Sequence, residues 1–375
     1  MIKVAWVRGS HLNRFEGQNY IFKDSIRFVG FGSMHSIHTD LPFPVIRLPT
    51  IGDYIPVTRP IKIITNRLLG DAQVLFGLSM YAKEFDIFHT ADPHYYYSYQ
   101  LARLRKSGMI KNLIVTSWET IPFNNESVAK KREIKRFVLD QADSFLCYTE
   151  RAKDCLLMEG IEEKKITVCK LGVDIRRFSQ NTSYKKKAMN GITILFVGRL
   201  VEEKGILDLY HAFSVIKARN DNIHLNIVGK GPLQNRLESM IRKDNLTGYV
   251  TIKNLSYDQM PSAYSTSDLM VLLSKKTKTW EEQYGMVLVE SMASGIPLLC
   301  YETGAISEII GNAGILTSPD DQSELILALV RMIKDKNLRQ KLGTMGRRRA
   351  VAYFDNSKVA QNISRYYVRC FENRK

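Results

Sequence analysis

The stretch ILFVGRLVEEKGI, residues 194–206, contains the features that decide the fold. An apolar run ends at Gly198, a charged loop follows, and Gly205 precedes the helical stretch ILDLYHAF. An apolar run without alternation is typical of a strand buried on both faces, as in a parallel sheet covered by helices. The stretch therefore predicts a strand, a loop at its carboxyl end and a helix, the repeating pattern of an α/β domain.

The same alternation of strand and helix patterns continues along nearly the whole chain. Strands are expected at residues 3–7, 86–90, 112–117, 144–149 and 166–170, and then at 192–198, 223–229, 250–254, 268–274 and 296–301. Helical patterns lie between them, for example at residues 130–142. The repetition predicts doubly wound parallel sheets.

A polar stretch without periodicity, FSQNTSYKKKAMNG at residues 178–191, interrupts this alternation. We interpret 178–190 as a linker between an N-terminal domain, residues 1–177, and a second domain, residues 191–356. A last helix, about 357–375, is expected to pack back on the first domain. Ligands bind such sheets beyond the carboxyl ends of their strands, so two facing sheets would share a cleft.

The composition fits a soluble protein of two domains, with 375 residues, 45% hydrophobic and 25% charged. No apolar run is long enough to span a membrane, and the start, MIKVAWVRGS, is typical of a strand, not of a signal peptide. The five cysteines are scattered without a CxxC motif, which favours a reducing, cytoplasmic location over disulfides or a zinc site. Cys147 and Cys300 lie in apolar runs and are expected to be buried.

The charge of the chain is strongly positive, with 54 Lys+Arg against 38 Asp+Glu and a formal net charge of +16. Such a field attracts phosphates, whether of nucleotides, nucleic acid or anionic lipid. A generally basic surface is the alternative, and charge by itself does not choose among these partners.

Two cations follow the strand at 192–198. Arg199 lies at its carboxyl end, and Lys204 comes just before the next helix, so both could bind a diphosphate. Solvated loop charges are the alternative. The next strand ends in a similar way, with Gly229 and Gly231 on either side of Lys230, but the full GxGxxG motif of dinucleotide-binding folds is lacking.

The stretch WEEQYGMVLVESMASGIP, residues 280–297, predicts a helix from Gly285 or Met286 to about Ser294. The amides of Gly285 to Val287 have no acceptor within the helix and form an anion site. Glu282 precedes the helix and Glu290 lies on its second turn. Glu290 is either a partly exposed helix acid or a ligand of a polar group such as a ribose diol.

Taken together, these motifs resemble those of retaining glycosyltransferases of family 4, which have the GT-B fold. FVGRLVEEKGILDLYHAF, IVGKGPL, YSTSDLMVLLS, EEQYGMVLVESMASGIPLL and GAISEIIGNAGIL occur in the order of that family. VCKLGVDIRRF, residues 168–178, is similar to the family's interdomain segment, and LRQKLGTMGRRRAVAYFDNSKVA to its closing helices. The resemblance implies two Rossmann-like domains facing a cleft, with the nucleotide sugar bound by the second.

The resemblance also implies a role for each matching residue. Arg199 and Lys204 match the pair that binds the diphosphate, and Glu282 matches the acid that contacts the donor sugar. Glu290 matches the acid that holds the ribose. The remaining donor-binding candidates are backbone or base-proximal positions: Gly198, Gly229, Gly231, Pro232, Gly285, Met286 and Val287.

The first half of the chain matches the family less closely. Members often carry a Gly-Gly loop after the first strand, where NRFEGQNY, residues 13–20, offers only Gly17 as a donor-loop candidate. Members also often carry a histidine after the strand that corresponds to LIVTSWET, residues 113–120, whereas this chain has Trp118 and Glu119 there. Glu119 is a candidate at the anomeric centre or the acceptor hydroxyl, and Trp118 either stacks on a sugar or belongs to the core. His89 and His94 either line the cleft on the acceptor side or are buried.

The expected function is retaining transfer of a hexose from a UDP- or GDP-sugar to a glycan or lipid-linked acceptor, as part of glycan biosynthesis. No cofactor and no metal are expected, because the chain has no Asp-x-Asp motif to bridge a metal to the diphosphate. Basic stretches at 103–111 and 130–141 favour peripheral contact with an anionic membrane at its cytosolic face. The alternative is a non-catalytic basic protein that binds nucleic acid or a membrane surface, although nucleic acid is not an expected partner of the enzyme.

Overall fold

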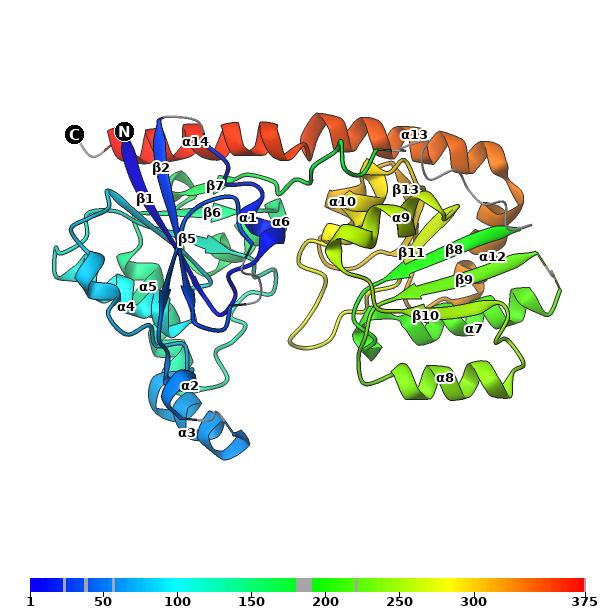
Figure 1. Cartoon of the computed structure of the whole chain (residues 1–375), viewed down its shortest axis with the longest axis horizontal. Coiled ribbons are helices and arrows are strands. Elements are labelled where there is room, and N and C mark those ends of the chain that lie inside the picture. The colour runs from blue at the N-terminus through cyan, green and yellow to red at the C-terminus, as the bar shows by residue number, and fades with distance from the viewer. Residues whose placement is uncertain (23–24, 37–39, 56–57, 180–190, 220–221, 374–375) are drawn as a thin grey trace. The chain divides into compact units, whose positions relative to one another are not determined.

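The computed structural model describes residues 1–22, 25–36, 40–55, 58–179, 191–219 and 222–373. The chain divides into two compact units, the first formed by Met1–Leu171 with Asn356–Lys375 and the second by Gly172–Asp355. Each unit is a parallel sheet with helices on its faces (Figure 1), so the α/β prediction is confirmed.

The first unit contains a seven-stranded parallel sheet in the order β3-β2-β1-β4-β5-β6-β7. Its strands are β1 (Ile2–Gly9), β2 (Ile26–Ser33), β3 (Val45–Leu48), β4 (Ile87–Ala91), β5 (Leu113–Ser117), β6 (Ser144–Cys147) and β7 (Ile166–Val168). Its helices are α1 (Arg14–Gly17), α2 (Ile51–Tyr54), α3 (Arg59–Leu69), α4 (Tyr96–Lys106), α5 (Ala129–Gln141), α6 (Glu150–Met158) and α14 (Asn356–Glu372), with 3-10 turns η1 (Leu78–Tyr81) and η2 (Glu163–Lys165).

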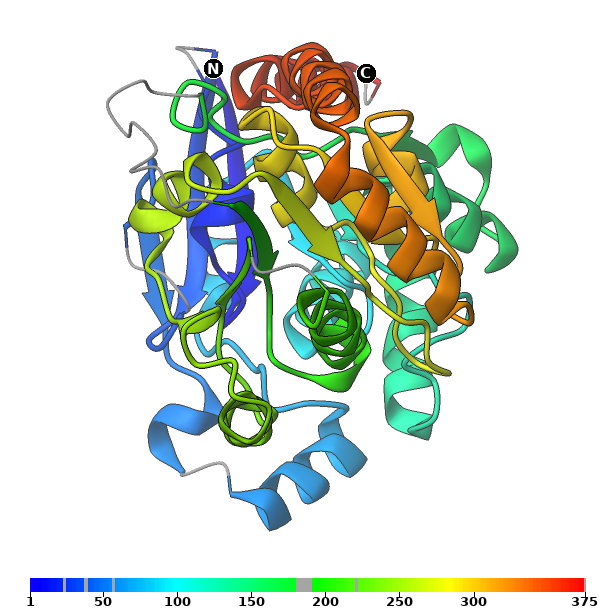
Figure 2. The same cartoon turned by 90° about the vertical axis from the view of Figure 1, so that its right-hand side faces the viewer.

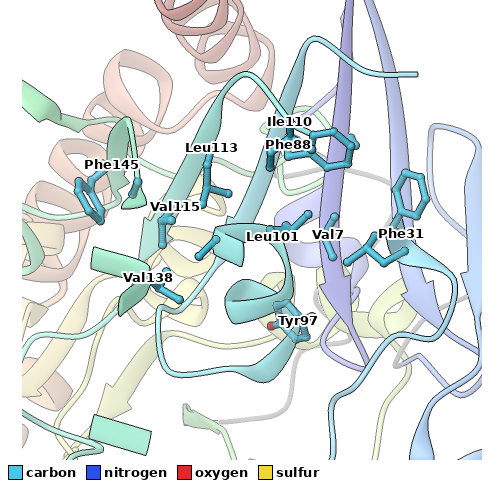
Figure 3. Close-up of a cluster of buried hydrophobic side chains, with 14 of the residues drawn as sticks. Val7, Phe31, Phe88, Tyr97, Leu101, Ile110, Leu113, Val115, Val138 and Phe145 are labelled. Atoms are coloured by element: carbon cyan, nitrogen blue, oxygen red, sulfur yellow. The ribbon is translucent and has the colours of Figure 1, made fainter. Parts of the chain in front are cut away.

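Alternate residues of these strands point to opposite faces of the sheet. Phe88 of β4 points into the apolar core that the sheet forms with α4 and α5, where it joins Leu101 and Val138 (Figure 3). Its neighbour His89 points the other way and bonds Tyr367 of α14. The last helix thus covers the second face of this sheet (Figure 1).

The second unit contains a six-stranded parallel sheet in the order β10-β9-β8-β11-β12-β13. Its strands are β8 (Ile192–Val197), β9 (Ile223–Val228), β10 (Val250–Lys253), β11 (Leu269–Leu272), β12 (Leu298–Tyr301) and β13 (Gly314–Thr317). Its helices are α7 (Ile206–Lys217), α8 (Gln234–Lys243), α9 (Met260–Ser265), α10 (Met286–Ala293), α11 (Ile306–Ile310), α12 (Gln322–Lys334) and α13 (Lys336–Tyr353), with turns η3 (Glu202–Lys204) and η4 (Tyr257–Gln259).

Helices cover both faces of this second sheet (Figures 1 and 2). From β8 to β10 successive strands are added toward one edge of the sheet, and from β11 to β13 they are added toward the other. The switch falls between β8 and β11, which lie side by side at the centre of the sheet. Such a switch point opens a crevice at the carboxyl ends of the two strands, and ligands of doubly wound sheets bind there. Arg199 follows β8 and Ser274 follows β11, so both lie at this point.

The second unit begins at Gly172, six residues before the linker that the sequence suggests. Residues 172–178 belong to this unit because they pack and form hydrogen bonds with the rest of it. Val173 pairs with Asp355, and Arg177 donates to the carbonyl of Tyr257 at 2.6 Å. Phe178 is buried against Tyr264. Residues 180–190 of the expected linker lie outside the described residues.

Ten of the strands lie where the sequence pattern predicts them, whereas β2, β3 and β13 were not expected. Cys147 and Cys300 are fully buried, as predicted. Among the described residues, no helix combines the length and the apolar character needed to cross a bilayer.

Candidate functional site

The loop after β8 is held tightly against its neighbours at the carboxyl end of the second sheet. Gly205, which caps the start of α7, has φ +66, and a Cβ added there would lie 1.9 Å from the carbonyl oxygen of Leu273. Gly229, after β9, has φ +150, and its Cβ would lie 1.9 Å from the oxygen of Gly198. Both positions therefore require glycine, since a side chain would push the loops apart.

Lys204 and Glu282 form an ion pair in this region, with 2.6 Å between Nζ and Oε2. The hydroxyl of Ser274 donates to the same Oε2 at 2.6 Å. The pair is largely shielded from water, with 15% of the Lys204 side chain and 8% of the Glu282 side chain exposed. The Lys204 ammonium also lies 4.9 Å from the centroid of the Trp280 ring. A cation and an acid 78 residues apart in sequence are thus brought together.

Backbone contacts fix the position of Glu282. Its carbonyl oxygen accepts a hydrogen bond from the amide of Ala305 at 2.8 Å. Gly304, with φ +56, packs so closely that an added Cβ would lie 2.2 Å from that same oxygen. The carboxylate is therefore presented by a loop that the turn before α11 holds in place.

Helix α10 begins four residues after Glu282. Gly285 caps it with φ +79, and the helix extends from Met286 to Ala293, which confirms the predicted element. The first amides of a helix have no acceptor inside it and carry a partial positive charge. The N-terminus of α10 thus supplies donors beside the Lys204–Glu282 pair.

Arg199 is the exposed member of the predicted site. Its side chain is 61% exposed, and its nearest ionic contact is Glu203, with 3.8 Å between Nη2 and Oε1. The guanidinium is therefore free to bind a ligand at the carboxyl end of β8. Its salt bridge is long and exposed, so it contributes little to folding.

Glu290 is buried in the second turn of α10 and is 3% exposed. The hydroxyl of Tyr264 donates to its Oε2 at 2.8 Å. Burial raises the pKa of Glu290 to about 7, although the Tyr264 hydrogen bond and the positive charge of Arg177 act in the opposite direction. The structure therefore excludes a solvated helix acid at this position.

Replacement of Glu290 by glutamine is expected to remove a pH dependence of stability. Native Glu290 keeps its proton to a higher pH than the unfolded chain does, so its contribution to the free energy of unfolding falls as pH rises from 4.5 toward about 7. Glutamine mimics the neutral form, so the stability of Glu290→Gln relative to the wild type should rise by up to about 3 kcal/mol between pH 5 and pH 8. Urea unfolding at the two pH values measures this difference. The control is Glu302→Gln, at an exposed acid of the same unit. If the difference in unfolding free energy between Glu290→Gln and the wild type is the same at both pH values, the raised pKa of Glu290 is contradicted.

In the first unit, Glu119 organises its own loop. One carboxylate oxygen accepts from the amides of Thr120 and Ile121 at 3.1 and 3.2 Å, and the other accepts from the side chains of Asn124 and Asn125 at 2.9 and 3.0 Å. The side chain is buried, and burial raises its pKa. Both oxygens thus accept hydrogen bonds within residues 119–125, and a contact of Glu119 with the substrate stays a prediction.

For His89 the sequence left open a place on the acceptor side of the cleft or a buried position, and the structure shows it buried. Its side chain is fully buried. Its Nδ1 is hydrogen-bonded to the hydroxyl of Tyr367 at 2.6 Å, and its Nε2 to the hydroxyl of Thr116 at 2.7 Å. Burial and the charge of Arg8 lower its pKa to about 3, so it is a neutral core residue.

The other candidates of the first unit are less enclosed. His94 is half-buried with its ring 4.4 Å from that of Tyr95. Burial lowers the pKa of His94 to about 3. Trp118 is also half-buried and packs edge-on against Tyr148 at 4.5 Å. Both remain predictions as acceptor contacts.

Gly17 ends the short helix α1 and is buried. A Cβ at Gly17 would lie 2.9 Å from a methyl group of Leu41, and a role of Gly17 in a donor loop stays a prediction.

Sequence reasoning missed two side-chain partners of the site and one buried network. Ser274 and Tyr264 hold the two predicted acids, and both occur in the family-like stretch YSTSDLMVLLS, but nothing in the pattern marks them. In the first unit, Arg8 pairs with Glu16 at 2.8 Å, and the Tyr148 hydroxyl donates to the same carboxylate at 2.5 Å. The side chain of Arg8 at the end of β1 was the available signal.

Comparisons with known proteins show to which fold this geometry belongs. The model of the family described as "Glycosyl transferases group 1" matches residues 179–349. Anabaena Alr3699/HepE, solved in complex with UDP, has a TM-score of 0.75 and 16% identity, covering 98% of this chain and 100% of that one. Sucrose-phosphate synthase from Thermosynechococcus elongatus has a TM-score of 0.76 and 18% identity, covering 100% of both chains. The chain therefore has the GT-B fold.

Curated relatives are similar over parts of their length. The chain is 30% identical over 152 residues to alpha-D-kanosaminyltransferase of Streptomyces kanamyceticus, covering 40% of this chain and 38% of that protein. It is 25% identical over 243 residues to the capsular polysaccharide biosynthesis glycosyltransferase CapM of Staphylococcus aureus, covering 60% of this chain and 61% of that protein. The matched region thus spans less than two thirds of these relatives.

Proposed function

We propose that this protein transfers a hexose from a nucleotide-sugar donor to a hydroxyl of a glycan or lipid-linked acceptor. The observation that carries the proposal is the shielded Lys204–Glu282 ion pair beside the N-terminus of α10, at the switch point of the second sheet. The family match covers this region, and similarity to glycosyltransferases by sequence and by fold supports the class.

The donor would lie across the carboxyl ends of β8 and β11. We assign the diphosphate to Arg199, Lys204 and the α10 amides, and the ribose to Glu290. Glu282 would contact the donor sugar while it holds the Lys204 ammonium in place. The nucleoside diphosphate is the leaving group, so fixed positive charge aimed at its phosphates stabilises the negative charge that develops as the bond to the anomeric carbon breaks.

Two finer features belong to this proposal. The reaction is metal-independent, since the cations of the site replace the ion that an Asp-x-Asp motif would bind, and no such motif occurs in the chain. It proceeds with retention of configuration, as the resemblance to family 4 implies. UDP is the first nucleotide to test, because the structures of Anabaena HepE include complexes with UDP and with UDP-glucose. The enzyme would work in the cytoplasm, and a lipid-linked acceptor would bring it to the membrane.

Turnover of nucleotide sugars tests the proposal. The purified protein is incubated with UDP- and GDP-hexoses in EDTA, with and without candidate acceptors, and release of nucleoside diphosphate is followed. We expect slow release with one donor class, faster release with an acceptor, and a product whose anomeric proton coupling shows retention. Loss of all release in EDTA, restored by a divalent cation, would contradict metal independence. No release from any donor would contradict the transferase assignment.

A further inference from the structure

Helix α3 of the first unit turns its most apolar side outward. Ile63, Ile64 and Leu68 are 61%, 56% and 65% exposed, whereas Thr65 of the same helix is buried. Positions 60, 63, 64, 67 and 68 share one face by helical spacing, and each of them is exposed. A surface helix normally buries its aliphatic stripe against the core, so this orientation is the reverse of the usual one.

Further exposed apolar side chains lie close to α3 along the chain. Tyr54 at the end of α2 is 70% exposed and Ile55 is 50% exposed. The ring of Tyr54 lies 5.8 Å from that of Phe76, which is itself 43% exposed, and Met80 is 81% exposed. Figures 1 and 2 both show α2 and α3 projecting from the first unit on the side away from α14. Grouped apolar exposure of this kind marks an interaction surface.

The charge of this segment has a single sign. Arg59, Lys62 and Arg67 lie between Asp53 and Asp71, and no acidic residue occurs in that interval. Arg67 is exposed on the same face as the two isoleucines. The end of α3 packs on α5, where a Cβ added to Gly70 would lie 2.7 Å from a methyl group of Ile134.

We propose that the exposed face of α3, together with the end of α2, docks this protein on an anionic lipid bilayer. A helix with aliphatic residues and cations and without acids lies in the interface plane, where its apolar side chains enter the acyl region and its cations meet lipid phosphates. Exposed tyrosine beside such a helix suits the headgroup region. An acidic protein surface would satisfy the cations but not the adjacent isoleucines and leucine.

This docking surface deepens the lipid-linked acceptor proposed above, and it differs from the basic stretches that the sequence suggested. It does not involve the donor site in the second unit. Membrane binding and nucleotide binding can therefore fail separately.

Vesicle flotation tests the docking surface. The full chain is mixed with vesicles of phosphatidylcholine alone or with about 30% phosphatidylglycerol, and the bound fraction is measured. We expect binding to the anionic vesicles, and at least a tenfold loss of affinity for the variant Ile63→Asn, Ile64→Asn, Leu68→Asn. The matched control, Val215→Asn with Leu327→Asn, changes exposed aliphatic residues of α7 and α12 and should bind like the wild type.

Two further measurements complete the test. Arg67→Gln should weaken binding to the anionic vesicles about fivefold, the effect of one cation near such a surface. In the variant Ile64→Trp, the fluorescence emission of the new tryptophan should shift to the blue when these vesicles are added. Thermal shift by nucleotides, measured on the triple-asparagine variant, should match that of the wild type and so separates this surface from the donor site.

Three outcomes would overturn the proposal. The wild type does not float with either vesicle, or the triple-asparagine variant floats as well as the wild type. In the third, sedimentation shows that the three substitutions dissociate an oligomer while no vesicle binding occurs, which would make this face an interface between copies of the chain.

Discussion

Alanine in place of Arg199 is expected to lower kcat for sugar transfer about 100- to 1,000-fold. This is the usual effect of removing one hydrogen-bond donor that stabilises the negative charge developing in the transition state. Its guanidinium is 61% exposed and its contact with Glu203 is long, so stability should change by less than about 0.5 kcal/mol. Initial rates and thermal unfolding of the same preparation measure the two effects.

Arg219→Ala is the control for Arg199→Ala, because Arg219 is an exposed cation near the end of α7, away from the carboxyl ends of the strands. It should leave both turnover and stability unchanged. An equal loss of turnover in both variants would mean that general positive charge, and not a positioned guanidinium, supports the reaction. Unfolding of Arg199→Ala would contradict its assignment as an exposed ligand-binding residue.

Alanine in place of Lys204 should have two effects, because this residue holds Glu282. We expect a loss in kcat of about 1,000-fold or more, since a charge-assisted contact with the leaving group disappears. Stability should also fall by about 2 kcal/mol, because the largely buried Glu282 carboxylate loses its cation and keeps the Ser274 hydroxyl.

A second substitution separates these two effects. Adding Glu282→Gln to Lys204→Ala removes the uncompensated charge, so most of the lost stability should return while turnover stays low. Denaturant unfolding and initial rates on the wild type, the two single variants and the double variant form the cycle. Recovery of turnover together with stability would show that the pair is structural and would contradict its place in the donor site.

Much of the fold could be predicted because buried parallel strands are apolar on both faces. The strands that escaped prediction lack that signal. β2 reads IRFVGFGS, with glycines at 30 and 32 beside Phe43 and Leu12, and an isolated glycine weakens a strand pattern. β3 and β13 have four residues each, too few for periodicity to distinguish a strand from a loop.

The candidate site could be predicted in part for a related reason. Glycines and cations at strand ends are local signals, and Gly205, Gly229 and Gly285 all have positive φ. Which residues meet across the sheet is set by tertiary packing, so the contact between Lys204 and Glu282 and the bond from Tyr264 to Glu290 could not be read from spacing. The same limit explains His89, whose polar side chain suggested chemistry but bonds to Tyr367 and Thr116, neighbours that the fold supplies.

Nucleotide binding in the absence of metal tests the central claim most directly. Thermal unfolding is followed in EDTA with UDP, GDP and their sugar conjugates at increasing concentration. At about 100 times its Kd, the correct nucleotide should stabilise the protein by about 2.7 kcal/mol, which raises the midpoint by roughly 5–10 °C. Arg199→Ala should require a much higher concentration for the same shift. If no nucleoside diphosphate shifts the midpoint of the wild type, the second unit does not bind the proposed donor.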